Sequence, residues 1–170
     1  QIHKKKIPKY PKKVCIVTSL GSDAYNDFVK HTASKFPIIE LYTADVRVQG
    51  IGAVPSLLKV LPKTDKMGFD AIVVTRGGGS IEDLAAFNDE DVARMIFSLK
   101  TPTVVAIGHE ANESLSEWVA DVRASTPTDA ANIISTGYQS LLESLEQLGL
   151  RLKSNYAYYF SANFQRLDHI

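Results

Sequence analysis

The feature that most constrains the fold is the alternation of short apolar runs with longer amphipathic segments. The apolar runs have the length and β-branched content of buried strands, and they lie at residues 14–18, 37–42, 70–75 and 103–107. Helices are expected at 22–34 with Ser22 as the N-cap, at 53–61, at 89–99 and at 115–120. This alternation predicts an α/β fold with a doubly wound, mostly parallel sheet of the Rossmann-like or flavodoxin-like kind.

A glycine loop follows the third of these runs. Residues 70–75 lead into Arg76 and then into three consecutive glycines, Gly77, Gly78 and Gly79. Glycine lets the backbone turn tightly and approach a ligand, and Ser80 is suited to cap a following helix. A phosphate there would meet backbone N–H groups, a helix N-terminus and the Arg76 guanidinium. Because the spacing is neither that of a dinucleotide fingerprint nor that of a Walker loop, an ordinary turn with a salt-bridged arginine is the alternative.

A second polar segment follows the fourth run, where the chain reads Gly108-His-Glu-Ala-Asn112. The carboxyl ends of parallel strands share one edge of a sheet, so Arg76 and His109 are expected to face one crevice. Histidine acts there as a general acid or base, or as a metal ligand, and the alternative is a capping or merely polar loop residue. The spacing of the acidic and histidine residues does not define a metal site, which leaves both Mg²⁺ and no metal open.

The two ends of the chain differ from the middle. Six lysines crowd residues 4–13 around Pro8, Tyr10 and Pro11, a composition that fits a solvated linker or a segment that follows a nucleic-acid backbone. From about Thr128 the strand signal ends, and one long helix, or two with a bend near Gly137, is expected. Its leucines at 141, 145, 148 and 152 have coiled-coil spacing.

Composition sets broad limits. The 170 residues are 45% hydrophobic and 22% charged, which suits one domain with a tail, and no run reaches the length of a membrane span. The one cysteine, Cys15, excludes an intramolecular disulfide framework and fits a reducing cytoplasm. Its apolar neighbours predict a core position. The net charge of zero argues mildly against a nucleic-acid partner.

Eight short segments nevertheless resemble, in order and spacing, the large subunit of exonuclease VII between residues 6 and about 134. They are Pro8-Lys-Tyr-Pro11, Val17-Thr-Ser19, Val48-Gln-Gly50, Arg76-Gly-Gly-Gly-Ser-Ile-Glu-Asp-Leu84, Phe87-Asn-Asp-Glu90, Gly108-His-Glu110, Val119-Ala-Asp121 with Arg123, and Thr126-Pro127. The resemblance implies an exodeoxyribonuclease that hydrolyses the phosphodiester bonds of single-stranded DNA to short oligonucleotides in the cytoplasm.

The resemblance also implies a division of the chain. Residues 1–13 would be a basic linker after an N-terminal OB-fold domain that this sequence lacks, and residues 14–135 the α/β nuclease domain. Residues 136–170 would begin the coiled-coil-like helical extension that binds the small subunits. No membrane partner is implied.

Individual site residues carry over by resemblance. Asp27, Arg76 and His109 match positions associated with nuclease activity, and the glycine loop with Ser80 would bind phosphate. Glu110 is placed with the substrate- and phosphate-binding residues, and either Asp27 or Glu110 would orient His109 or help to hold water or a metal. Asn112 occupies a fourth catalytic position where the family has aspartate, and asparagine carries neither a proton nor a charge. This departure, with the missing OB-fold, makes a catalytically impaired nucleic-acid-binding or regulatory homologue the alternative.

Two further readings complete the expectations. Asp121 and Arg123 are expected to form an ion pair beneath the site, or a purely structural one. A small-molecule phosphate enzyme on the same kind of sheet is a weaker third reading, because no nucleotide-binding fingerprint is present.

Overall fold

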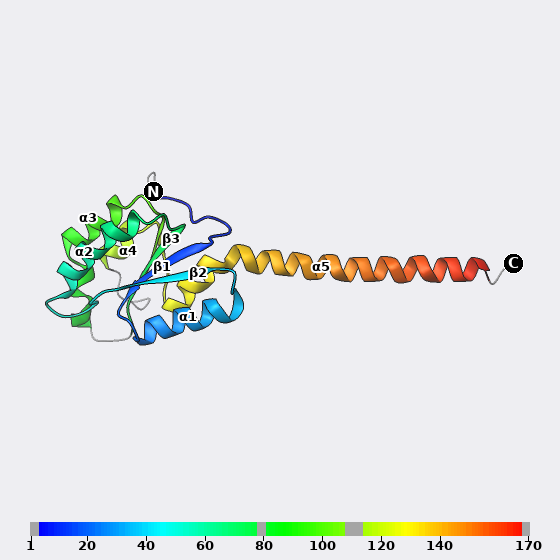
Figure 1. The fold of residues 1–170 in the computed structure, drawn as a ribbon, viewed down its shortest axis with the longest axis horizontal. Helices are drawn as coiled ribbons and strands as arrows, with labels where there is room; N and C mark the ends of the chain where they lie inside the picture. The colour runs from blue at the N-terminus through cyan, green and yellow to red at the C-terminus, as the bar shows by residue number, and fades with distance from the viewer. Residues whose placement is uncertain (1–3, 78–80, 108–113, 168–170) are drawn as a thin grey trace. The chain divides into compact units, whose positions relative to one another are not determined.

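The centre of the fold is a five-stranded, all-parallel sheet with the strand order β2-β1-β3-β4-β5 (Figure 1). It is seen in a computed structural model that describes residues 4–77, 81–107 and 114–167. The strands are β1 (Lys13–Thr18), β2 (Glu40–Asp45), β3 (Ala71–Thr75), β4 (Thr103–Ala106) and β5 (Val122–Arg123). This order is the flavodoxin-like arrangement of a doubly wound sheet, so the predicted fold class is confirmed.

Helices cover both faces of the sheet (Figure 1). They are α1 (Asp23–Lys35), α2 (Ala53–Asp65), the 3₁₀ helix η1 (Ile81–Phe87), α3 (Glu90–Ser98), α4 (Leu115–Val119) and α5 (Pro127–Leu167). The helices α2, α3 and α4 lie on one side, and α1 lies on the other with the first turns of α5. His31 of α1 and Asn132 of α5 are joined by a 2.7 Å hydrogen bond. The expected N-cap is present, since Ser22 Oγ accepts from the Tyr25 N–H.

The alternation of strand side chains explains how the core forms. In β1 and β3, Cys15, Val17, Ile72 and Val74 point to the side covered by α2 and α3 and join one apolar cluster. Helices α2 and α3 contribute Leu57, Leu61, Val92 and Ile96 to the same cluster. All five residues of β3 and all four of β4 are buried, as expected for central parallel strands. The chain divides into two compact units, residues 1–135 and 136–170.

Three elements differ from the sequence-based expectation. Strand β2 begins at Glu40 rather than at 37, because the Ile39 N–H bonds to the Phe36 carbonyl in a turn. Helix α2 continues through Pro62 to Asp65, beyond the expected end at 61. The two-residue strand β5 was not expected.

The C-terminal segment is one continuous helix without a break at Gly137, which decides between the two readings left open by the sequence. Its leucines at 141, 145, 148 and 152 are exposed on the helix. No helix in the described part of the chain is both long and apolar enough to cross a bilayer.

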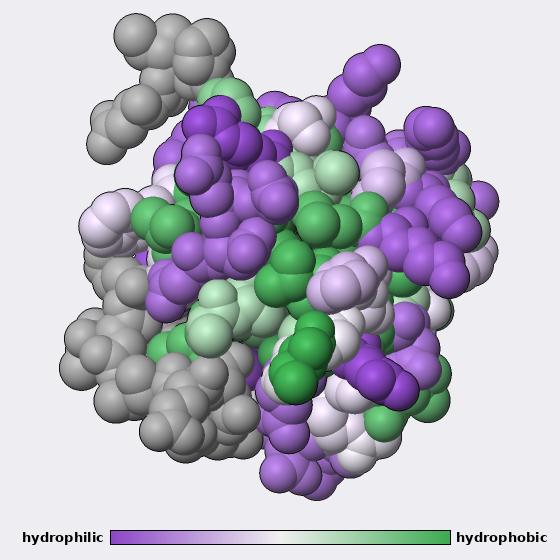
Figure 2. Space-filling view, turned by 90° about the vertical axis from the view of Figure 1, so that its left-hand side faces the viewer, coloured by the Kyte–Doolittle hydropathy of each residue, from purple (hydrophilic) through white to green (hydrophobic). Residues whose placement is uncertain are grey.

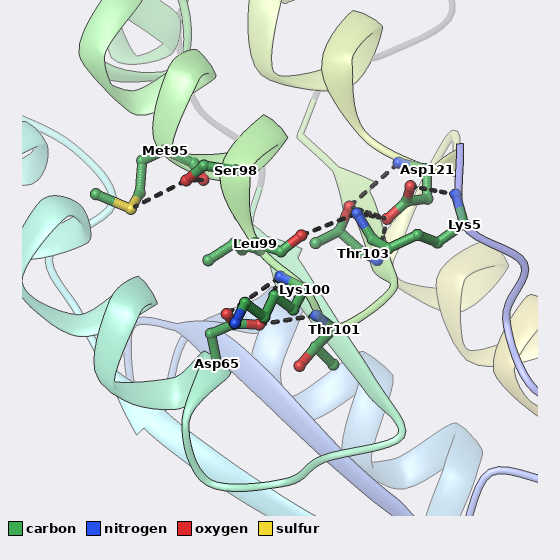
Figure 3. Close-up of polar contacts among 9 residues, drawn as sticks. All are labelled: Lys5, Asp65, Met95, Ser98, Leu99, Lys100, Thr101, Thr103 and Asp121. Carbon is green, nitrogen blue, oxygen red and sulfur yellow. Dashed lines mark hydrogen bonds and ion pairs between the residues drawn. The ribbon is translucent and has the colours of Figure 1, made fainter. Parts of the chain in front are cut away.

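Carboxylates fix the backbone where β4 begins (Figure 3). Asp121 accepts hydrogen bonds from the backbone N–H of Lys5 at 2.6 Å and of Thr103 at 2.8 Å, and its carboxylate pairs with Lys5 Nζ at 3.1 Å. Lys5 Nζ also donates to the Leu99 carbonyl. The expected Asp121–Arg123 pair is therefore wrong: Asp121 is paired with Lys5, and Arg123 Nε lies 3.8 Å from Glu117. The reason is that Asp121 lies at the amino end of β4, where the N-terminal segment passes.

Cys15 fits the predicted core role. Its side chain is buried, and burial raises the pKa of the thiol to about 11. Since the thiolate is the reactive form, we expect no labelling of Cys15 by iodoacetamide at pH 8 in the native protein and full labelling in denaturant. Mass spectrometry measures the difference, and rapid native labelling would contradict the buried position.

Asp65 holds the turn before β4 (Figure 3). Burial alone would raise its pKa, but hydrogen bonds from the Thr101 and Lys100 backbone N–H groups outweigh burial and lower the pKa. A carboxyl group with a lowered folded-state pKa stabilises the fold above its unfolded pKa of about 3.9, and this contribution is lost as pH falls through the folded value.

We therefore expect Asp65→Asn to lower the thermal transition at pH 7 and to have a progressively smaller effect below about pH 4. Thermal melts of both proteins across this range measure it. An effect that is the same at pH 7 and pH 2.5 would contradict the assignment.

Candidate active site

A polar cavity of about 460 Å³ opens at the carboxyl edge of the sheet. Its walls come from the segments that follow three neighbouring strands, β1, β2 and β3. The described lining residues are Ser19, Leu20, Gly21, Ser22, Asp23, Arg47, Val48, Gln49 and Gly77. The cavity lies where the strand order reverses around β1, which is the position at which doubly wound sheets bind ligands.

The strands run toward the left in Figure 1, and Figure 2 views the molecule from that side. Polar side chains surround a smaller apolar area among the described residues of this face.

Arg76 lies at the end of β3, where the sequence places it, and its side chain is buried with only 6% exposed. Its backbone N–H bonds to the Ala106 carbonyl, and the Thr75 hydroxyl donates to the same carbonyl at 2.8 Å. These bonds join the end of β3 to the end of β4. A buried guanidinium interacts strongly with a nearby anion because little water screens it.

Gly77 lies in the wall of the cavity and against the start of α1. A Cβ atom at this position would lie 3.5 Å from the Ala24 nitrogen, which is an ordinary contact. The absence of a side chain instead leaves the backbone accessible to a ligand.

Asp27 is exposed on α1, one helical turn after Asp23. Asp23 lines the cavity, and residues four apart lie on the same face of a helix. Asp27 is therefore near the cavity but is not part of its described wall. Its catalytic role stays a prediction.

The remaining expected site residues, Gly78, Gly79, Ser80, His109, Glu110 and Asn112, lie outside the described residues. Their roles stay predictions. The two positions that flank residues 108–113 are described, however, and both are held by one side chain.

That side chain is Glu117, which is fully buried. One of its oxygens, Oε1, accepts from the Ile107 N–H at 3.4 Å, and the other, Oε2, accepts from the Ser114 N–H at 2.8 Å and its hydroxyl at 3.1 Å. The Ser114 hydroxyl in turn caps α4, forming a capping box. Glu117 thus holds Ile107 and Ser114, the two described residues on either side of positions 108–113. The sequence analysis missed this residue, although Ser114-x-x-Glu117 is the sequence signature of a capping box.

Within the described residues, no group of three or more histidine, cysteine or acidic side chains is arranged to hold a metal ion. A second cavity, of about 420 Å³, lies beside α3 and α4 and is lined mainly by apolar side chains such as Phe97 and Trp118. It is not at the strand ends, and the Glu90–Arg94 pair at its rim is an ordinary surface ion pair.

The fold and this edge of the sheet together define a flavodoxin-like α/β domain with a polar cavity at its switch point. The family model for the large subunit of exonuclease VII matches residues 1–170, and the chain belongs to this family.

The exodeoxyribonuclease 7 large subunit of Campylobacter fetus is 49% identical over 143 residues, which cover 84% of this chain and 37% of that protein. The corresponding subunit of Staphylococcus haemolyticus is 40% identical over 168 residues, 99% of this chain and 38% of that protein. The corresponding subunit of Campylobacter lari is 42% identical over 168 residues, which cover 98% of this chain and 43% of that protein. The chain thus spans about two fifths of the length of these relatives.

Proposed function

We propose that this chain is the nuclease part of an exonuclease VII large subunit, which hydrolyses phosphodiester bonds of single-stranded DNA to short oligonucleotides. The observation that carries the proposal is the family match over the whole chain, with relatives named exodeoxyribonuclease 7 large subunit. The polar cavity at the switch point supports it, because that is where a phosphate-containing ligand is expected to bind.

Phosphodiester hydrolysis needs an activated water, stabilisation of charge on the phosphoryl oxygens and protonation of the leaving oxygen. Arg76 and the N–H groups of the glycine loop, from Gly77 to Ser80, would stabilise the charge. His109 would act as general acid or base, with Asp27 or Glu110 orienting it. Asn112 would accept or donate a hydrogen bond at the position where the family has a carboxylate.

The proposal includes two partners and a location. Single-stranded DNA is the substrate, and small subunits bind the helical region that begins in α5, where the leucines along residues 141–152 are exposed. A cytoplasmic location suits both a DNA substrate and the reduced Cys15.

The test uses the full-length subunit assembled with its small subunits and end-labelled single-stranded DNA, with and without EDTA. We expect short oligonucleotides as products, and the EDTA arm shows whether a divalent metal is needed. If the DNA binds but is not cleaved in either arm, the nuclease function is wrong and the chain is a non-catalytic nucleic-acid-binding homologue.

A further inference from the structure

Arg47 is a cavity residue that the sequence analysis did not single out. It follows β2, and it is the one cationic side chain among the described residues that line the polar cavity. Gly77, the residue after Arg76, lines the same cavity. Arg76 itself is not among the described lining residues, so the cavity brings Arg47 together with the residue that follows Arg76, on a different strand end.

The backbone on both sides of Arg47 is fixed. Val46 and Val48 are buried at 3% and 6% exposed, so that Arg47 projects outward between two core residues. The Val46 N–H bonds to the Thr18 carbonyl, and the Arg47 N–H bonds to Ser56 Oγ at 3.1 Å. These contacts hold the residue at the cavity wall, whereas an exposed arginine on a free loop would have no fixed position.

Gly52 makes room for the Arg47 side chain. A Cβ atom at Gly52 would lie 3.1 Å from both Cδ and Nη1 of Arg47. Gly52 has φ of −87° and ψ of −2°, an ordinary helical conformation that does not require glycine. A side chain at position 52 would require the Arg47 side chain to shift by a few tenths of an ångström, so Gly52 leaves the guanidinium room where it lies.

The charge of Arg47 is also available. Among the described residues it forms no ion pair, and the nearby Asp45 carboxylate accepts a hydrogen bond from the Leu20 N–H. A positioned guanidinium in a polar cavity is suited to bind the two non-bridging oxygens of a phosphodiester with two parallel N–H donors.

We propose that Arg47 binds a backbone phosphate of the single strand next to the phosphate that is cleaved, a subsite that sets substrate affinity. This inference rests on the proposed nuclease function. Arg47 is assigned to binding rather than to the chemical step, since it follows β2 and Gly77 follows β3, on opposite sides of β1 in the sheet order.

The test compares Arg47→Gln, Arg47→Lys and Gly52→Ala in the full-length subunit assembled with its small subunits. Steady-state cleavage of a labelled oligonucleotide is measured from low to moderate salt. For Arg47→Gln we expect KM to rise roughly 10-fold with kcat within about twofold, because a charge-assisted contact to the bound substrate is lost. The slope of log KM against log salt should fall by about 0.7, the value for one phosphate contact on a single strand.

The other variants make the result specific. Arg47→Lys should keep the salt slope and recover part of the affinity, since it keeps the charge and loses the planar fork. Gly52→Ala should raise KM in the same direction by displacing the guanidinium. Arg94→Gln, which removes a surface arginine paired with Glu90 on α3, is the matched control and should change neither quantity.

Parental KM and salt slope in an Arg47→Gln enzyme that cleaves DNA would overturn the proposal while leaving the nuclease function intact. If the parent binds the oligonucleotide without cleaving it, the nuclease function fails, and the same slope measured on Kd still decides the role of Arg47. A parent that neither binds nor cleaves single-stranded DNA overturns both.

Discussion

Replacing Arg76 with glutamine should reduce kcat on single-stranded DNA by roughly 10²- to 10³-fold, the usual effect of removing one preorganised donor from a developing oxyanion. The large effect is expected because the Arg76 side chain is buried at the end of β3, where little water screens its charge. Arg76→Lys should recover only a small part of the activity, because an ammonium group cannot donate two parallel hydrogen bonds.

The measurement is single-turnover cleavage of end-labelled DNA by the assembled enzyme, with the thermal transition of each variant measured alongside. The Arg94→Gln enzyme serves again as the control. If the folded Arg76→Gln enzyme keeps a kcat within threefold of the parent, Arg76 is not part of the catalytic machinery.

The second large effect is expected at Glu117. Its two oxygens accept from the residues on either side of positions 108–113, one from the Ile107 N–H and the other from the Ser114 N–H. Glutamine has only one acceptor oxygen, so Glu117→Gln must turn an NH₂ group toward one of these donors. We expect kcat to fall by at least roughly 10-fold, because a small misplacement of His109 is enough to slow the reaction, while Kd for DNA stays near that of the parent.

Loss of a buried hydrogen bond to a charged group also lowers stability, by about 2–3 kcal/mol, so a loss of activity by itself does not prove positioning. Asp65→Asn is the matched control, because Asp65 also binds backbone N–H groups at a turn but lies before β4 rather than after it. Both variants are assayed at temperatures equally far below their own thermal transitions. Equal losses of kcat in the two would assign Glu117 to stability alone.

The sequence predicted the fold where burial produces a continuous apolar run. Strands β1, β3 and β4 are buried along almost all of their length, and the predicted ranges differ from the observed ones by one residue. Strand β2 lies at the edge of the sheet, and its residues are mainly exposed or half-buried, so its hydrophobic pattern is weak. The apolar residues just before it, which the sequence predicts as its start, form a turn instead.

Two other differences have local causes. Strand β5 has two residues, too few to show any period. Helix α2 continues past Pro62, a residue that usually ends a helix, and the Thr64 hydroxyl donates to the Val60 carbonyl in this last turn.

The candidate site was predictable only in part. Motifs at the strand ends led to Arg76 and Gly77, because parallel strands bring their carboxyl ends to one edge. Arg47 belongs to no motif, and only the structure shows that it lines the cavity. Glu117 had a readable capping signature, but that signature does not reveal that the same carboxylate also reaches the Ile107 N–H across ten positions of sequence.

The contact between Lys5 and Asp121 bears on where an independently stable domain begins. The two residues are 116 positions apart, so this contact ties the first described residues of the chain to the last strand of the sheet. A protein trimmed to start at Val14, just inside the first strand, would leave the buried Asp121 carboxylate without its cation and one of its amide donors. Limited proteolysis before β1 should therefore loosen β5, at the edge of the sheet, and the neighbouring strand β4. Hydrogen exchange would show this as faster exchange of the backbone amides of these two strands.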